Sequence, residues 1–287
     1  MAKSTKYLDS NLVSQEHTHD ILPSHYKILI CCNCNLYFKD FIPGDDELKR
    51  FYNSLGDQEW NYQHIHPPES YLIDILKSLP DKSDVLDVGC NTGRLLKNET
   101  ERLNCYGVEI NKAAATVAEQ AGIKIIAEKV HNENLGEEKF DLITLIDVFE
   151  HLNDPMPFLR QLVKALKPGG KLYIFTGRTD CLPSLICGSY NWYYKPAQHL
   201  IFLNSKFIRW YKRNNNGIRV SITSMRHFNS NLRARVYQIS WLIAWRFFSP
   251  SSPYRIFAMK KLARMKEPFM VTAWKDHVFF TIEKDRL

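Results

Sequence analysis

The stretch that decides the fold runs Val85-Leu86-Asp87-Val88-Gly89-Cys90-Asn91-Thr92-Gly93-Arg94-Leu95-Leu96. Its apolar start predicts a buried strand, its small residues a tight turn, and its last residues the opening of a helix. Gly89 and Gly93 leave room for a ligand to approach the backbone, and free N–H groups at the start of the helix can meet an anionic group. The stretch therefore predicts a nucleotide-type binding site at the end of the strand.

An acidic residue follows at the distance expected for a ribose contact. Glu109 closes the next apolar segment, Cys105-Tyr106-Gly107-Val108, about twenty residues after the turn, where a carboxylate binds a ribose diol. We therefore expect a ligand with an unmodified ribose. An NAD site would require the spacing G-x-G-x-x-G, whereas this turn has glycine at positions 89 and 93 only, so a dinucleotide fits poorly.

At these residues the chain resembles the class I methyltransferases that use S-adenosylmethionine. Their first motif commonly reads D-x-G-x-G-x-G, and Asn91 stands here at the middle glycine. Three further segments follow in the order of that family: Phe140 to Asp147 for the fourth strand, Glu150-His151-Leu152 after it, and Leu166 to Ile174 into the fifth. The resemblance covers residues 84–176. It implies an α/β, Rossmann-like, doubly wound and mainly parallel seven-stranded sheet, with an N-terminal extension and a helical insertion before the last strand.

The resemblance also implies S-adenosylmethionine as cofactor and a set of residues that bind it. We expect Asp87 near the amino end of the methionine moiety, Glu109 at the ribose and Ile110 against one face of the adenine. Glu128 follows the apolar Ile125-Ile126-Ala127 and would meet the adenine amino group. The full set of expected cofactor residues is Asp87, Gly89, Cys90, Asn91, Gly93, Glu109, Ile110, Glu128 and Asp147.

The reaction implied is transfer of a methyl group from a sulfonium to a nucleophile. Because the donor is already activated, the protein must align the acceptor and remove a proton if the acceptor is a hydroxyl. In the ubiquinone-pathway O-methyltransferases that the chain resembles, a similar Glu-His pair lies at the reaction site, which makes His151 the expected general base beside Glu150. Alternatively, Asp147, Glu150 and His151 bind a divalent metal against the acceptor oxygen, or the pair only orients the following helix.

A second histidine lies in an aromatic segment after the fifth strand. His199 follows Tyr190-Asn191-Trp192-Tyr193-Tyr194, and in similar enzymes this region covers the acceptor pocket. Rings there would stack on a phenol or on the apolar face of a sugar, while His199 would bond the acceptor or take its proton. In the alternative interpretation the rings seal the edge of the sheet around a hydrogen-bonded histidine.

Residues 1–45 form a polar lead with cysteines and histidines, ahead of a methyltransferase domain over 46–287. That domain divides into a cofactor core at 84–176 and a substrate cap with insertion at 177–275. In the lead, Cys31 and Cys34 form a C-x-x-C turn that resembles the second knuckle of a small zinc module preceding some sugar and polysaccharide methyltransferases. The first knuckle is missing. The upstream candidates for completing a zinc site are His17, His19 and His25, and a degenerate module without metal is the alternative.

The net charge of +7 is unevenly distributed. From residue 188 onward 18 Lys and Arg face 4 Asp and Glu, whereas the remainder is acidic. Residues 232–266 mix aromatic side chains with many cations and hardly an acid, a pattern typical of segments that lie on membrane surfaces. The apolar stretch from Val236 to Phe248 is too short to span a bilayer. The alternative is that these aromatics pack on the catalytic domain and the cations coat its outside.

Together these patterns predict a cytoplasmic methyltransferase that methylates an oxygen of a small molecule, sugar or glycolipid. The basic aromatic segment adds the hypothesis that the protein is peripheral to the inner face of a membrane. No secretory signal or membrane span is recognisable, and the odd number of seven cysteines does not suggest a disulfide framework. A non-catalytic S-adenosylmethionine-binding regulatory or partner protein is the alternative. An RNA methyltransferase is less favoured, because no RNA-binding module is recognisable. The sequence contains no signal for oligomeric state.

Overall fold

The computed structural model describes residues 5–13, 25–44, 46–48, 50, 65–130, 135–188, 191–196, 198–228, 230–248 and 274–286. Their largest element is a seven-stranded sheet in the order β10-β11-β8-β7-β4-β5-β6. Its strands are β4 (Asp84–Val88), β5 (Asn104–Val108), β6 (Lys124–Ala127), β7 (Phe140–Ile146), β8 (Leu166–Gly177), β10 (Ile218–Met225) and β11 (His277–Lys284). The predicted seven-stranded α/β sheet is confirmed.

The direction of the strands explains where a ligand can enter. Pairs from β8 through β7, β4 and β5 to β6 are parallel, whereas β11 runs antiparallel to both β8 and β10. The strand order reverses between β4 and β7, and a doubly wound sheet forms a crevice at such a switch point, beyond the carboxyl ends of its strands. The last two strands, β10 and β11, lie side by side.

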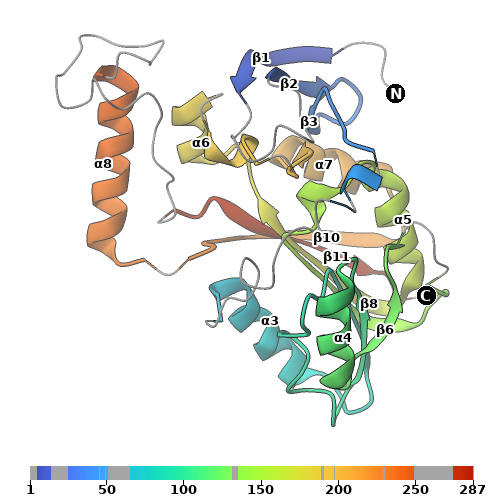
Figure 1. Ribbon diagram of the computed structural model, residues 1–287. Helices are drawn as coiled ribbons and strands as arrows, with labels where there is room; N and C mark the ends of the chain where they lie inside the picture. The colour runs from blue at the N-terminus through green and yellow to red at the C-terminus, as the bar shows by residue number, and fades with distance from the viewer. Residues whose placement is uncertain are drawn as a thin grey trace.

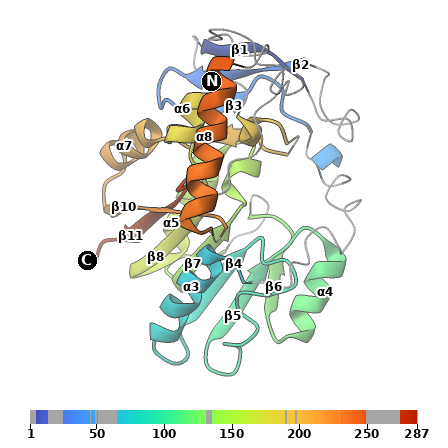
Figure 2. The same ribbon diagram turned by 90° about the vertical axis from the view of Figure 1, so that its left-hand side faces the viewer.

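Helices cover both faces of this sheet (Figures 1 and 2). On one face α3 (Pro67–Ser78) and α4 (Lys112–Gln120) pack through residues such as Leu72, Leu76 and Ala118. On the other, α5 (Pro155–Ala165) and α7 (Ser205–Asn214) pack through residues such as Phe158 and Phe207. Both faces are therefore buried, as a parallel sheet requires.

The helix predicted directly after Gly93 is wrong. Residues 91–102 form consecutive turns, whose backbone bonds alternate between three-residue and four-residue spacing, as in Leu96 and Lys97 both bonding to the Gly93 carbonyl. The guanidinium of Arg102 donates to the carbonyls of Leu76 and Leu79. This segment is thereby held on the C-terminal end of α3, and its own carbonyls do not form a regular helical ladder.

The lead segment belongs to a second sheet. Strands β1 (Thr5–Val13), β2 (His25–Cys31) and β3 (Tyr37–Lys39) are joined by β9 (Ile201–Phe202), in the order β1-β2-β3-β9. The lead is thus hydrogen-bonded to the region after the fifth parallel strand, through Tyr37 and Phe38. The domain boundary near residue 45 stays a prediction.

Cys31 ends β2 and Cys34 lies in the turn that leads to β3, where the Asn35 N–H donates to the Cys31 carbonyl over 2.8 Å. The Cys31 and Cys34 thiols influence each other's pKa. Among the described side chains, no third His, Cys, Asp or Glu joins them in a group that could hold a metal. His17 and His19 lie outside the described residues, as does the side chain of His25, so zinc stays a prediction.

The insertion before the last strand contains α8 (Leu232–Phe248), which lies beside α6 (Leu182–Cys187) at the left of Figure 1. Leu242 and Trp245 are buried, and Leu242 packs with Cys187. Within the described part of the chain, no helix is long and apolar enough to cross a membrane. The second half of the predicted 232–266 segment, from residue 249, lies outside the described residues.

We predict that Gly93→Ala lowers the free energy of unfolding more than Gly217→Ala does. Both glycines have positive φ, +78° and +73°, so each alanine costs about 1–2 kcal/mol of backbone strain. A Cβ at Gly93 would also meet the Ile123 side chain, whereas a Cβ at Gly217 meets nothing within 4 Å. Denaturant unfolding of both variants measures the difference. Equal losses would show that the turn is not tightly packed.

Candidate active site

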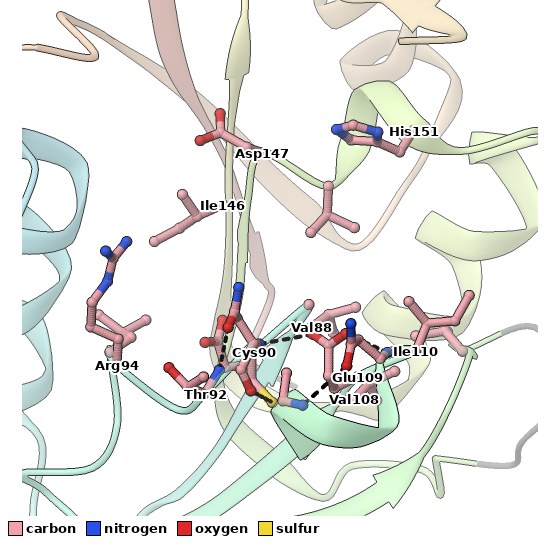
Figure 3. Close-up of a pocket in the computed structure, with 18 of the residues that line it drawn as sticks. Val88, Cys90, Thr92, Arg94, Val108, Glu109, Ile110, Ile146, Asp147 and His151 are labelled. Carbon is pink, nitrogen blue, oxygen red and sulfur yellow. Dashed lines mark hydrogen bonds between the residues drawn. The ribbon is translucent and has the colours of Figure 1, made fainter. Parts of the chain in front are cut away.

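A pocket of about 800 Å³ opens at the carboxyl ends of β4, β5 and β7 (Figure 3). This volume lies in the range of about 300–1,000 Å³ that small-molecule sites occupy. Eight of the nine predicted cofactor residues line it: Asp87, Gly89, Cys90, Asn91, Glu109, Ile110, Glu128 and Asp147. The exception is Gly93, which is not a lining residue and lies against Ile123 and Ala118.

The turn after β4 depends on left-handed backbone conformations. Gly89, Asn91 and Gly93 have φ of +74°, +50° and +78°. Asparagine tolerates this region better than most side chains do, which explains how Asn91 replaces the expected middle glycine. Its side-chain oxygen also accepts from the Thr92 N–H over 2.6 Å. The departure from the family motif therefore preserves the shape of the turn.

Glu109 joins the loops that follow β4 and β5. Its two carboxylate oxygens accept backbone N–H groups, one from Asn91 over 2.8 Å and the other from Asn111 over 2.7 Å. Burial raises the pKa of Glu109, against the lowering effect of these hydrogen bonds. The carboxylate thus has a structural role in addition to the ribose contact expected of it, and it still faces the pocket.

Asp87 is 4% exposed and faces the same pocket. Burial raises the pKa of Asp87 to about 7, and the charges of Glu109 and Glu69 act in the same direction, against a hydrogen bond of 2.7 Å from the Thr144 hydroxyl. A buried carboxyl with this pKa is poorly compensated by its own surroundings. A ligand with a cationic group would supply the missing charge.

Several lining residues had no signal in the sequence. Arg94 and Glu69 form an ion pair beside the turn, and Glu69 also accepts the His66 N–H over 2.8 Å at the start of α3. His66 and His227 line the pocket as well. Arg94 lies in the glycine-turn motif, whereas His66 and Glu69 come from the start of α3 and His227 from the segment after β10. The last three lie far from the recognised motifs, so only the folded structure brings them to the site.

Asp147 and His151 lie on the opposite side of the pocket from Glu109 and Ile110 (Figure 3). Asp147 has a φ of +53°, and its Oδ2 lies 2.9 Å from Nε2 of His227. Burial opposes ionisation of Asp147, but the charge and hydrogen bond of His227 outweigh it and lower the pKa. The same contact raises the pKa of His227, against the effect of burial.

Of the predicted catalytic pair, only His151 lines the pocket, whereas Glu150 does not. His151, at the end of the short helix η3 (Phe149–His151), lines the pocket, and burial lowers its pKa to about 4. Glu150 is 1% exposed and does not line the pocket. Its two oxygens accept the hydroxyls of Thr176 and Tyr193, each over 2.8 Å. Burial, followed by the charge of Asp147, raises the pKa of Glu150 to about 8.

In the described part of the aromatic segment, Trp192, Tyr193 and Tyr194 pack toward the second sheet and are not among the residues that line the pocket, contrary to one interpretation of the sequence. Tyr193 and Tyr194, in the short helix η5 (Trp192–Tyr194), are buried in a cluster with Tyr26, Ile28 and Phe202. His199 is likewise absent from the lining. Its Nδ1 lies 3.0 Å from the Tyr193 carbonyl, and its ring meets that of His151 edge-on at 5.1 Å. Burial holds the pKa of His199 well below its ordinary value.

The three residues predicted as metal ligands, Asp147, Glu150 and His151, fall into two different groups. Among the described residues, two groups have ligand atoms close enough to share an ion. One combines Glu150 and His151 with His199, and the other combines Asp147 with His227 and His277. Asp147 therefore does not join Glu150 and His151 as the sequence suggested.

The pocket matches S-adenosylmethionine in its chemistry. Asp87 presents a carboxyl that a cationic ammonium would stabilise, and Glu109 presents one suited to hydroxyls. Between α4 and β6 the wall is largely apolar and suits a planar ring; it includes Ile110, Ala113, Ala114, Val117 and Val130. The carboxyl of Asp87 would repel a carboxylate or phosphate bound beside it. This argues against a nucleotide whose phosphates lie there.

Comparisons with known proteins agree with this site. A family model described as a methyltransferase domain matches residues 61–220. The ubiquinone biosynthesis O-methyltransferase of Pseudomonas fluorescens (strain SBW25) is 30% identical over 131 residues, 42% of this chain and 56% of the relative. The protein of the same name from Hahella chejuensis is 27% identical over 189 residues, 55% of this chain and 79% of the relative. The chain thus spans little more than half the length of several of these relatives.

Among solved structures, phosphoethanolamine N-methyltransferase 2 of Haemonchus contortus, in complex with S-adenosyl-L-methionine, superposes with a TM-score of 0.54. It is 16% identical and covers 88% of this chain and 63% of its own, a likeness that concerns the fold alone. The family match extends over more than half of the chain and includes the glycine turn and Glu109. The protein belongs to the class I S-adenosylmethionine-dependent methyltransferases.

We predict that cofactor binding is linked to ionisation of Asp87. The carboxyl is protonated below its pKa of about 7 in the free protein, whereas an ammonium beside it favours the charged form, so binding releases a proton. Affinity for S-adenosylhomocysteine should therefore rise with pH and level off above about 7, with a change of about fivefold between pH 6 and pH 7. Calorimetry at several pH values measures it.

The matched control is Asp87→Asn, which cannot titrate and should bind more weakly with little dependence on pH in this range. An equal slope in the variant and the wild type would contradict the assignment of Asp87.

Proposed function

We propose that this protein methylates a hydroxyl oxygen of a small molecule, using S-adenosylmethionine as donor. The observation that carries the proposal is the arrangement of one pocket. The residues suited to the donor, Asp87 and Glu109, lie on one side, and a polar group that includes Asp147 and His151 faces them across it (Figure 3). A methyl group held between the two sides would face an acceptor bound at the second.

The bound donor would supply an activated methyl group: the acceptor oxygen forms a bond to the methyl carbon, the carbon–sulfur bond breaks, and its electron pair returns to sulfur. The chain must hold the acceptor oxygen in line and receive its proton. His151 is the proposed proton acceptor. With a pKa of about 4, its imidazole is neutral at pH 7 and can accept a hydrogen bond from the hydroxyl.

So weak a base cannot remove the proton in advance. A hydroxyl oxygen becomes strongly acidic only as it forms its third bond to the methyl carbon, and at that moment an imidazole of low pKa is sufficient. We therefore expect proton transfer to His151 late in the reaction. Glu150, buried behind this residue and bonded to Thr176 and Tyr193, would fix the position of the loop and would not exchange a proton with the acceptor.

Two observations favour a phenolic hydroxyl over a sugar or glycolipid. The relatives that cover the central region are named ubiquinone biosynthesis O-methyltransferases. The saccharide interpretation depended on the resemblance of the lead segment to sugar-modifying enzymes and on aromatic walls at the pocket, and Tyr193 and Tyr194 are packed elsewhere. The lining of the pocket also includes the apolar side chains of Phe158, Leu152 and Ile146.

We predict that the purified protein transfers a methyl group from S-adenosylmethionine to a catechol such as 3,4-dihydroxybenzoate, more rapidly than to monosaccharides or RNA. His151→Asn should reduce kcat by about 10²–10⁴-fold, the usual contribution of a general base, with the Kd of S-adenosylhomocysteine unchanged. Formation of S-adenosylhomocysteine measures turnover. His199→Asn is the control, because His199 does not line the pocket.

In wild-type protein the kcat should not fall until the pH approaches 4 to 5, where His151 becomes protonated. Binding of the cofactor without turnover on any acceptor class would instead favour the non-catalytic alternative. Preferential methylation of RNA would favour the alternative that the protein is an RNA methyltransferase.

We further propose that α8 lies on an anionic membrane surface, where an apolar acceptor would be found. Leu232, Val236, Ile243 and Phe247 are 40–69% exposed, and their spacing places them along one side of the helix. The helix contains no Asp or Glu and carries Arg233, Arg235 and Arg246. An exposed apolar stripe flanked by cations is typical of helices that bind at the lipid interface.

We predict that the protein sediments with phosphatidylglycerol-containing vesicles at low salt and is released as salt rises, because its cations are screened. Ile243→Asp should weaken binding, since it places an acid in the apolar stripe. Ile222→Asp is the matched control: Ile222 is similarly exposed, 42% against 44% for Ile243, but lies on β10. Equal effects of the two substitutions, or no binding at low salt, would rule out docking through α8.

A further inference from the structure

Asp147, His227 and His277 form a cluster at the acceptor side of the pocket. They come from three places in the chain: the loop after β7, the segment after β10 and the first residue of β11. Each offers one ligand atom, and these atoms lie within 4.8 Å of one another. Asp147 and His227 also line the pocket. Two imidazoles and one carboxylate are a ligand set that divalent transition metals bind.

The surroundings of His277 support a role as a ligand. Its Nδ1 lies 2.9 Å from Oδ1 of Asp276, and the residue is 3% exposed. Its ring stacks on Phe175 at 5.2 Å with an interplanar angle of 15°. A carboxylate that binds one imidazole nitrogen fixes the ring and its tautomer and leaves Nε2 for the metal, an arrangement found around most histidine ligands.

The distance between Asp147 and His227 fits two arrangements. Their 2.9 Å separation is that of a direct hydrogen bond or ion pair. It is also close to the roughly 3.0 Å between two ligand atoms that bind one metal at about 2.1 Å and at right angles. An ion pair of these two residues does not account for a third ligand-type side chain, His277, whose ring centre lies 4.9 Å from that of His227.

The neighbouring cluster of Glu150, His151 and His199 is a poorer metal site. Both oxygens of Glu150 already accept hydroxyl hydrogen bonds, and Nδ1 of His199 is close to the Tyr193 carbonyl. A metal there would have to displace the bonds of Glu150, which is almost fully buried. In the other cluster, the partner of Asp147 is itself one of the ligands.

We propose that Asp147, His227 and His277 bind one divalent transition-metal ion beside the acceptor. Three protein ligands leave coordination positions for water or for an acceptor oxygen, and an oxygen bound to such an ion becomes more acidic. This role rests on the proposed methyl transfer, because it would assist the weak base His151. Binding of the ion itself does not depend on that function.

The test is a titration of the full chain with Co²⁺, without donor or acceptor, followed by visible absorption. We expect one Co²⁺ per chain with nitrogen and oxygen ligands. His227→Gln should weaken binding most clearly, because it removes a ligand that is only partly buried. Asp276→Asn should weaken it by about 10–100-fold through its effect on His277, the usual size of such indirect effects. Circular dichroism and thermal unfolding would establish that both variants fold.

His199→Gln is the matched control and should bind Co²⁺ as the wild type does. Loss of binding in this variant, with binding retained in His227→Gln, would place the metal in the other cluster and overturn the proposal. A strong near-ultraviolet thiolate band would assign the ion to Cys31 and Cys34, with the same consequence. If the protein binds no Co²⁺ at all, the proposal is also overturned, and Asp147 and His227 form only an ion pair.

The same titration separates this proposal from the proposed function. Co²⁺ binding as expected, without methyl transfer to any acceptor, would contradict the function alone. Methyl transfer by chelator-treated protein that binds no Co²⁺ would contradict the metal site alone.

Discussion

The site depends on the contact between the Glu109 carboxylate and two backbone N–H groups, those of Asn91 and Asn111. These groups begin the loops that follow two adjacent parallel strands, so one side chain holds together the two loops that line this side of the pocket. Charged acceptors make stronger hydrogen bonds than neutral ones, and burial limits competition from water. A ribose bound to the same carboxylate would therefore contact a group that is already held in place. The same contact holds the left-handed turn of residues 89–93 at Asn91, and Asp87 lies two residues before that turn.

The pocket combines two electrostatic environments, one on the side of these two loops and one on the opposite side. Near the expected donor, burial raises the pKa values of Asp87 and Glu109. On the acceptor side, burial lowers the pKa of His151 and keeps it neutral, whereas Asp147 is ionised beside His227. The first environment is suited to a cationic ligand with a sugar diol. The second is suited to an oxygen nucleophile that must lose a proton, which is the division of labour that methyl transfer requires.

Much of the fold could be predicted because its signals are local. Buried strands such as Phe140–Ile146 are short apolar runs, and the turn at Gly89 is defined by the small residues that it contains. The residues predicted to bind the cofactor lie at or directly after the ends of such strands, and nearly all of them line the pocket.

The features that could not be predicted depend on contacts between distant residues. The helix expected after Gly93 does not form because Arg102 holds that segment on the end of α3, a contact between residues 23–26 apart. Similarly, the direction of Tyr193 depends on its bond to Glu150, 43 residues away. His227 and His277 reach the site only through the order of strands in the sheet, so no pattern in their own neighbourhood could indicate them.

The most direct test of this account is a crystal structure with bound S-adenosylmethionine. The account predicts that the ribose hydroxyls contact Glu109, that the ammonium lies at Asp87, and that the methyl group points toward the side of the pocket where Asp147 and His151 lie. A donor bound elsewhere, or with its methyl group directed away from these residues, would contradict it.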